Sequence, residues 1–106
     1  MDTIFIQIAS YRDRELVPTV LDALAQAAHP ERLSFGICWQ YQTEEELQYI
    51  EPLKNLKNCR IDAVSAAQSR GACWARSRTQ KLWRGERYTL QIDSHIVTNF
   101  LVKSYT

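Results

Sequence analysis

The chain has 106 residues, a length typical of one small domain or of part of a larger one. Hydrophobic residues make up 45% and charged residues 24%, which is close to the globular average and argues against a disordered chain, a collagen or a coiled coil. The net charge of +1 gives no sign of a general affinity for polyanions.

The charges are unevenly distributed along the chain. Residues 1–59 hold five basic and nine acidic side chains, whereas residues 60–87 hold seven basic and two acidic ones. A basic segment within a nearly neutral chain indicates a local anion site rather than a surface that wraps a polyanion.

Several features bear on the cellular compartment. No apolar run approaches the ~20 residues of a membrane span, and no basic n-region precedes the first short apolar stretch. The cysteines Cys38, Cys59 and Cys73 are odd in number and form no CxxC pair, which favours reduced thiols over a disulfide framework. We therefore expect a cytoplasmic protein without a membrane span.

The first expected element is a buried parallel strand at residues 3–9, a nearly continuous β-rich apolar run. The polar residues 10–13 form a loop in which Asp13 can cap a turn, and Pro18 suits the first turn of the helix that follows. Apolar residues keep helical spacing until the proline at position 30 ends this helix.

A second strand is expected at residues 33–39, where Gly36 either weakens the strand slightly or marks a close backbone approach. Thr43 then caps a short helix, and the three glutamates 44–46 in its first turn are interpreted as a solvated helix start. A third, shorter strand with alternating polarity is expected at residues 58–64.

The last elements are a helix at residues 71–83, an exit turn at 83–86 and a fourth strand at 88–92. Alternating strands and helices predict an α/β fold: a Rossmann-like parallel sheet with helices on both faces. The first strand should be central and parallel to the second and fourth, because helical crossovers of this length build parallel pairs. The sheet looks truncated, since the chain stops shortly after its fourth strand.

Asp93 and His95 project together at the carboxyl end of the fourth strand, because side chains along a strand alternate between faces. Ligands of open parallel sheets bind outside the carboxyl ends of the strands. A carboxylate and an imidazole can chelate one divalent cation, and this mixed ligation suits manganese better than calcium. Such a cation can bridge the phosphates of a nucleotide diphosphate. The alternative is a capping aspartate and a loop histidine.

The basic segment offers a second anion-binding feature. Arg70 and Gly71 stand where the free N–H groups of a helix start favour an anion, and Arg76 can pair bidentately with a phosphate or a carboxylate. The alternative is a solvated basic face that includes Arg78, Lys81 and Arg84. The tryptophans Trp74 and Trp83 are interpreted as core or edge packing.

The loop after the first strand belongs to the same edge. Ser10, Arg12 and Asp13 follow that strand, so a parallel sheet would bring them near Asp93. The alternative for these residues is an ST turn and a helix cap. Both interpretations stay open at this point.

Five segments occur in a recognisable order: IASYRD, FGICWQ, RGACWAR, WRGE and LQIDSH. Together, from Ile4 to His95, they resemble the protein-hydroxyproline N-acetylglucosaminyltransferases and their bacterial relatives. The resemblance implies a glycosyltransferase of the GT-A type with UDP-N-acetylglucosamine as donor. It also places Asp93-Ser94-His95 where such enzymes carry their Asp-x-Asp metal motif.

The resemblance assigns roles to five residues of the donor site. Ser10, Arg12 and Asp13 match the first-strand loop that holds the uridine end. Gly71 matches the glycine that lets the backbone approach the nucleotide, and Arg76 matches the arginine that orients the donor site.

Further positions match the family as well. Asp93 and His95 correspond to the ligands of the diphosphate and of a divalent metal, Mn²⁺ or Mg²⁺. Cys38, Trp39 and Cys73 also match, and we interpret these three as packing residues.

Two departures from the family pattern matter. Arg14 stands where many relatives have proline, and residues 96–106 no longer resemble the family. We therefore expect residues 1–95 to be the donor-binding half of a GT-A domain and 96–106 to be a divergent tail, as a premature stop or frameshift would produce. The acceptor half, with the catalytic residues and a further metal ligand, would then be absent.

The expected function is that of a truncated, catalytically incomplete transferase that still binds a UDP-sugar and a metal but not nucleic acid; its acceptor, protein or glycan, stays open. The alternative is a non-catalytic phosphate- or RNA-binding module built on the basic helix 70–87. Salt dependence separates the two, because nucleic-acid binding weakens steeply with salt.

Overall fold

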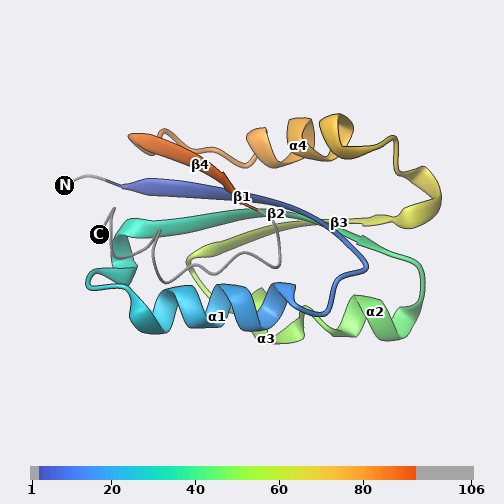
Figure 1. Ribbon diagram of the computed structural model, residues 1–106, viewed down its shortest axis with the longest axis horizontal. Helices are drawn as coiled ribbons and strands as arrows, with labels where there is room; N and C mark the ends of the chain where they lie inside the picture. The colour runs from blue at the N-terminus through green and yellow to red at the C-terminus, as the bar shows by residue number, and fades with distance from the viewer. Residues whose placement is uncertain (1–2, 93–106) are drawn as a thin grey trace.

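The computed structural model describes residues 3–92 of the chain. Over this range a parallel sheet of four strands lies between two layers of helices (Figure 1). The strands are β1 (Ile4–Tyr11), β2 (Leu33–Tyr41), β3 (Cys59–Ser65) and β4 (Tyr88–Ile92). The helices are α1 (Leu16–Gln26), α2 (Glu44–Gln48), α3 (Glu51–Lys54) and α4 (Ala72–Gln80), with 3-10 turns at Pro30–Arg32 and Ala66–Gln68.

The strand order β3-β2-β1-β4 confirms the predicted α/β class and the central place of β1. Ile4 of β1 lies opposite Leu33 of β2 and opposite Tyr88 of β4, and both pairings are parallel. Because all four strands run in one direction, their carboxyl ends meet at one edge of the sheet. That edge holds the loops that concern us below.

The two faces of the sheet differ in chemistry. Helices α1, α2 and α3 cover one face and α4 covers the other (Figure 1). The first face is a hydrophobic core, in which Ile8, Phe35 and Ile37 are fully buried beneath α1. The face under α4 is more polar: the Thr79 hydroxyl of α4 donates to Oε1 of the buried Gln7 over 2.8 Å. Hydrogen bonds therefore contribute to the docking of α4.

Three helix boundaries differ from those expected. Helix α1 ends at Gln26, because Ala27 already has extended backbone, and a 3-10 turn takes up Pro30. The helix expected after Thr43 is two short helices, since the chain bends at Ile50 before α3 begins. Helix α4 ends at Gln80, where an irregular turn leads to β4.

The cysteines are free, as expected, but their surroundings differ. Cys38 is buried, Cys59 is partly buried and Cys73 is exposed. Burial raises the pKa of Cys38 and of Cys59 to about 11, so both are protonated at neutral pH. The interpretation of Cys73 as packing is wrong, because Ala75 faces the sheet and Cys73, two residues earlier, lies on the opposite side of α4.

Gly36 lies against a side chain and not, as the sequence suggested, against a neighbouring backbone. The ring of Phe5 occupies the space where a Cβ atom of residue 36 would stand, and the guanidinium of Arg60 lies over that ring, 5.7 Å from its centroid. A side chain at position 36 must therefore displace a ring that is completely buried.

We expect Gly36→Ala to lower the free energy of unfolding by about 1–3 kcal/mol, the usual effect of overpacking. Urea denaturation monitored by circular dichroism measures the loss. The matched control is Gly36→Ala combined with Phe5→Leu, in which the smaller side chain makes room for the methyl group. If Gly36→Ala is as stable as the original chain, Phe5 does not pack against this glycine.

None of the helices within residues 3–92 is both long enough and apolar enough to cross a membrane.

Candidate functional site

Four of the predicted site residues lie at the carboxyl edge of the sheet. Ser10 stands near the end of β1, and Arg12 and Asp13 follow in the loop to α1. Gly71 precedes α4 and is reached from the end of β3 through the turn Ala66–Gln68. The predicted proximity of Ser10, Arg12 and Asp13 to Asp93 stays a prediction, because Asp93 lies outside the described residues.

A buried glutamine connects these segments. The side-chain amide of Gln40, near the end of β2, donates to the carbonyl oxygen of Ser10 over 3.3 Å. The Ser69 hydroxyl donates to Oε1 of Gln40 over 2.5 Å. Gln40 therefore ties the end of β1 to the loop that leads into Gly71. Sequence reasoning missed this role, although a glutamine that closes an apolar strand is a signal of a buried polar contact.

Ser10 is 1% exposed, and its hydroxyl group has no hydrogen-bond partner among residues 3–92. The ST turn considered as an alternative is therefore not formed. A buried hydroxyl without a partner costs roughly 1–3 kcal/mol. A polar atom that reached this hydroxyl would recover part of that free energy.

Asp13 acts as a turn cap, which was the alternative interpretation of this residue. Its Oδ1 atom accepts a hydrogen bond from the backbone N–H of Glu15 over 2.9 Å. Its carbonyl oxygen accepts from the N–H of Leu16, the first residue of α1. Asp13 thus directs the chain from the sheet edge into the helix.

Gly71 has a backbone that glycine alone adopts without strain, with φ at 94° and ψ at −179°. Apart from Gly71 and its two chain neighbours, no residue between 3 and 92 has a heavy atom within 4 Å of the position that a Cβ would take, so this space is open within the described residues. Among the described residues no side chain caps the first turn of α4, and Arg70 and Arg76 are both exposed nearby in the sequence. Free N–H groups, open space and exposed cations together suit an anion.

Much of the remaining basic charge is paired. Arg78 donates through Nε to Asp62 over 2.6 Å and through Nη2 over 3.0 Å. Arg60 donates to Glu86 over 2.6 Å. Arg78 is therefore not part of a solvated face, because Asp62 on β3 lies directly beneath it.

The two tryptophans of the basic segment have different surroundings. Trp74 packs against the cluster of Cys38, Val64 and Ala75, and its ring is covered by the guanidinium of Arg78 at 5.2 Å. Trp83 beyond the helix is 51% exposed, so it is an edge residue rather than a core residue. Cys38 and Trp39 are fully buried, which confirms their interpretation as packing residues.

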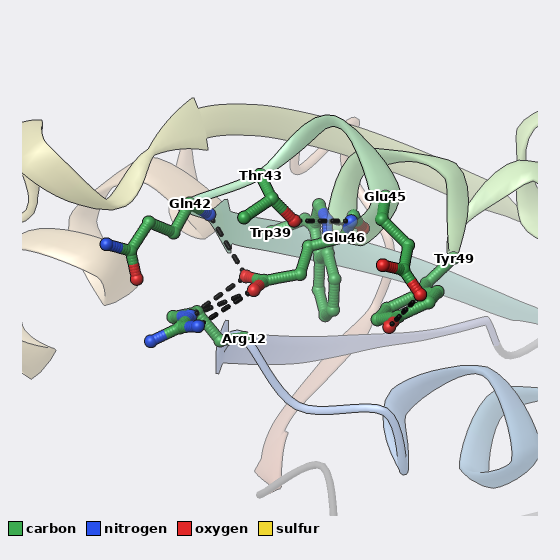
Figure 2. Close-up of polar contacts among 7 residues, drawn as sticks. All are labelled: Arg12, Trp39, Gln42, Thr43, Glu45, Glu46 and Tyr49. Carbon is green, nitrogen blue, oxygen red and sulfur yellow. Dashed lines mark hydrogen bonds and ion pairs between the residues drawn. The ribbon is translucent and has the colours of Figure 1, made fainter.

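Arg12 is engaged by Glu46, the third glutamate of the acidic helix start (Figure 2). Arg12 donates through Nε to Oε1 and through Nη2 to Oε2 of Glu46, both over 2.9 Å. Glu46 is only 8% exposed, so the expectation of three solvated glutamates is wrong for this residue and right for Glu44 and Glu45. The pKa of Glu46 lies below its ordinary value of 4.5, chiefly because Arg12 donates hydrogen bonds to its carboxylate.

The local sequence explains the position of Glu46. Its backbone N–H donates to the Thr43 hydroxyl over 3.1 Å, and its carbonyl accepts from the Trp39 indole over 3.0 Å (Figure 2). Its carboxylate turns back and accepts from the N–H of Gln42 over 3.0 Å. The spacing Thr-x-x-Glu is that of a capping box and could have shown that this glutamate folds back over the helix start.

The predicted metal ligands Asp93 and His95 lie outside the described residues. Strand β4, which leads to them, ends at Ile92 opposite Ile8 of β1. Within residues 3–92 no three His, Cys, Asp or Glu side chains come close enough to hold a metal ion. The metal assignment therefore stays a prediction on Asp93 and His95.

The family model described as Glycosyltransferase (GlcNAc) matches residues 3–55 and 44–101 of this chain. No curated protein matches. Among solved structures, the crystal structure of S. aureus TarS 1-349 is similar in fold, with a TM-score of 0.64 at 18% sequence identity. The match covers 96% of this chain and 31% of that one, so the chain spans about a third of the TarS structure.

Proposed function

Because the chain belongs to the Glycosyltransferase (GlcNAc) family, we propose that its carboxyl-edge site binds the sugar nucleotide UDP-N-acetylglucosamine. The resemblance to the protein-hydroxyproline N-acetylglucosaminyltransferases supports this donor. The whole enzyme would transfer N-acetylglucosamine to an acceptor that the present chain does not identify.

One observation carries the proposal: the strand order has a topological switch point between β1 and β4. From β1 the chain moves to β2 on one side, while β4 lies on the other side of β1. In open parallel sheets ligands bind outside the carboxyl ends of the two strands at such a point. The Ser10 to Asp13 loop begins with the last two residues of β1 and leads toward α1, and Asp93 follows β4 in the sequence.

The residues around this point suit the parts of a nucleotide diphosphate. At Gly71 the open space and the free N–H groups of α4 would admit the diphosphate, and Arg76 would pair with its charge. The Ser10 to Asp13 loop would hold the uridine end. We assign Asp93 and His95 to a divalent cation, Mn²⁺ or Mg²⁺, which would neutralise the charge of the departing diphosphate.

Calorimetric titration with UDP, with and without manganese, tests this proposal. We expect weak binding that depends on manganese and is abolished by a chelator, and Asp93→Ala should remove the manganese dependence. Asp22→Ala, on the exposed part of α1, is the matched control and should bind as the original chain does.

Two results would contradict the assignments. If UDP does not bind in the presence of manganese, the donor-site assignment is wrong. If UDP binds equally well without manganese, the assignment of Asp93 and His95 as metal ligands is wrong. Sugar transfer by these 106 residues alone is not expected, because acceptor positioning supplies roughly 7–11 kcal/mol and the chain covers 31% of the TarS structure.

A further inference from the structure

We propose that Glu46 is a positioning residue of the donor site: it holds the Ser10 to Asp13 loop in shape through Arg12, and Arg12 itself does not contact the donor. This inference rests on the proposed function. It gives Arg12 a different role from the uridine contact that the family resemblance implied, and it brings α2 into the donor site.

The backbone of the loop needs such support. Arg12 has φ at 54°, and it is the single non-glycine residue with positive φ among residues 3–92. This left-handed backbone conformation costs free energy for a residue with a long side chain. It persists where contacts with the surrounding structure hold the residue in place. The N–H of Arg12 donates to the carbonyl of Gln40 over 2.8 Å, and its side chain is held by Glu46. Two contacts therefore fix this one residue.

A second residue ties the same loop to α2. The guanidinium of Arg14 lies over the Tyr49 ring, 4.7 Å from its centroid, just beyond the end of α2. The proline that many family members carry at this position could not make that contact. The loop is thus attached to α2 at Arg12 and again at Arg14.

Helix α2 is itself fixed, so it can serve as a support. The Trp39 indole, completely buried in β2, donates to the carbonyl of Glu46, and the Thr43 hydroxyl caps the helix (Figure 2). The backbone of Glu46 is therefore fixed, and its carboxylate binds Arg12, which lies 34 residues earlier in the sequence. Strand β2 thus determines where the loop after β1 can lie.

The charges argue against a direct contact between Arg12 and the diphosphate. Two edge positions of the guanidinium, Nε and Nη2, already donate to the Glu46 carboxylate. This adjacent negative charge offsets the attraction that Arg12 would exert on an anionic donor. If the Arg12 side chain moved to the donor, the carboxylate of Glu46 would lose its ion-pair partner. This loss is unfavourable because Glu46 is only 8% exposed.

A double-mutant cycle measured by UDP titration with manganese tests the inference. If Arg12 and Glu46 act as one unit, Arg12→Ala and Glu46→Ala each weaken UDP binding by a similar factor, about tenfold, and the double variant is no weaker than either. If Arg12 contacts the donor, Arg12→Ala weakens binding while Glu46→Ala leaves it unchanged or strengthens it. That second pattern would overturn the inference.

Two further measurements separate loop positioning from global unfolding. Glu44→Ala, an exposed neighbour in the same helix turn, should bind UDP normally. Trypsin should cleave the Glu46→Ala chain faster at Arg12 and Arg14, while thermal unfolding shows that the rest is folded. If trypsin cleaves the Glu46→Ala chain no faster than the original chain, the role of Glu46 is contradicted, whether or not UDP binds. If the original chain does not bind UDP, only the proposed function is contradicted.

Discussion

Arg60→Ala is expected to lower the free energy of unfolding by about 3 kcal/mol, the lower end of the range for removing one partner of a buried ion pair. The side chains of Arg60 and Glu86 are 15% and 7% exposed, and their closest atoms are 2.6 Å apart. Arg60 also donates to the carbonyl of Leu82 over 2.7 Å. Alanine would leave both acceptors without this donor and would uncover the ring of Phe5.

The position of the pair explains why the loss is large. Arg60 lies on β3, whereas Leu82 and Glu86 lie in the connection between α4 and β4, so one side chain joins segments that are not neighbours in the sheet. The carboxylate of Glu86 is also held by the N–H of Arg84 over 2.8 Å. Although burial opposes it, these hydrogen bonds keep the pKa of Glu86 below its ordinary value, so the carboxylate is charged at neutral pH.

Urea denaturation measures this loss, and a second ion pair serves as control. Nζ of Lys54 lies 3.0 Å from Oε1 of Glu51, but both side chains are largely exposed. Lys54→Ala should therefore cost less than about 1 kcal/mol. Adding Glu86→Ala to Arg60→Ala should recover part of the loss, because it removes the unpaired carboxylate. Equal losses for Arg60→Ala and Lys54→Ala would show that the Arg60 pair is not a buried contact.

The strands and their order could be predicted from the sequence because both follow from local patterns. Short β-rich apolar runs predicted the strands, and the helical connections between them predicted parallel pairing with β1 at the centre. A close backbone approach was one of two interpretations of Gly36, but the group that lies there is the side chain of Phe5. Its partner, Phe5, could not be named, because the contact depends on how β1 and β2 align.

Side-chain pairing was the part that local patterns could not predict. The three glutamates after Thr43 looked equivalent, yet the capping geometry directs only Glu46 inward, toward an arginine 34 residues earlier. The basic segment looked like a solvated face, yet Arg78 is paired with Asp62 on the strand below. The number of charged residues in a segment predicts its net charge. Which of those charges form ion pairs depends on the alignment of the strands and helices in the fold.

For the candidate donor site, the sequence predicted that Ser10 and Asp13 lie at the carboxyl end of the first strand, and β1 does end at Tyr11, between these two residues. It predicted Gly71 at the start of a helix, and Gly71 is the residue before α4. It did not indicate Gln40, which joins those segments through buried hydrogen bonds. A buried polar side chain of this kind gives a weak sequence signal, because its partners are brought together only by the fold.

Gly71→Ala is expected to weaken UDP binding more than any other single change in the part of the site that the structure describes. A residue with φ at 94° and ψ at −179° lies in a region that is essentially restricted to glycine, and strain there costs roughly 1–3 kcal/mol. Relief of that strain would rotate the peptide planes at the start of α4 and turn their N–H groups away from the open space. The added methyl group would also project into the space that is open within the described residues.

Gly85 provides a matched control for this last experiment. Its φ is 91°, and nothing lies within 4 Å of its Cβ position either, but it belongs to the turn between α4 and β4, away from the carboxyl edge. Gly85→Ala should therefore lose similar stability in urea denaturation and keep its affinity for UDP with manganese. Gly71→Ala should lose both, since its strain is released within the anion site itself. If both variants bind UDP as the original chain does, the diphosphate does not lie at the start of α4. If both lose binding equally, the effect comes from general destabilisation, because only position 71 faces the space that the diphosphate would occupy.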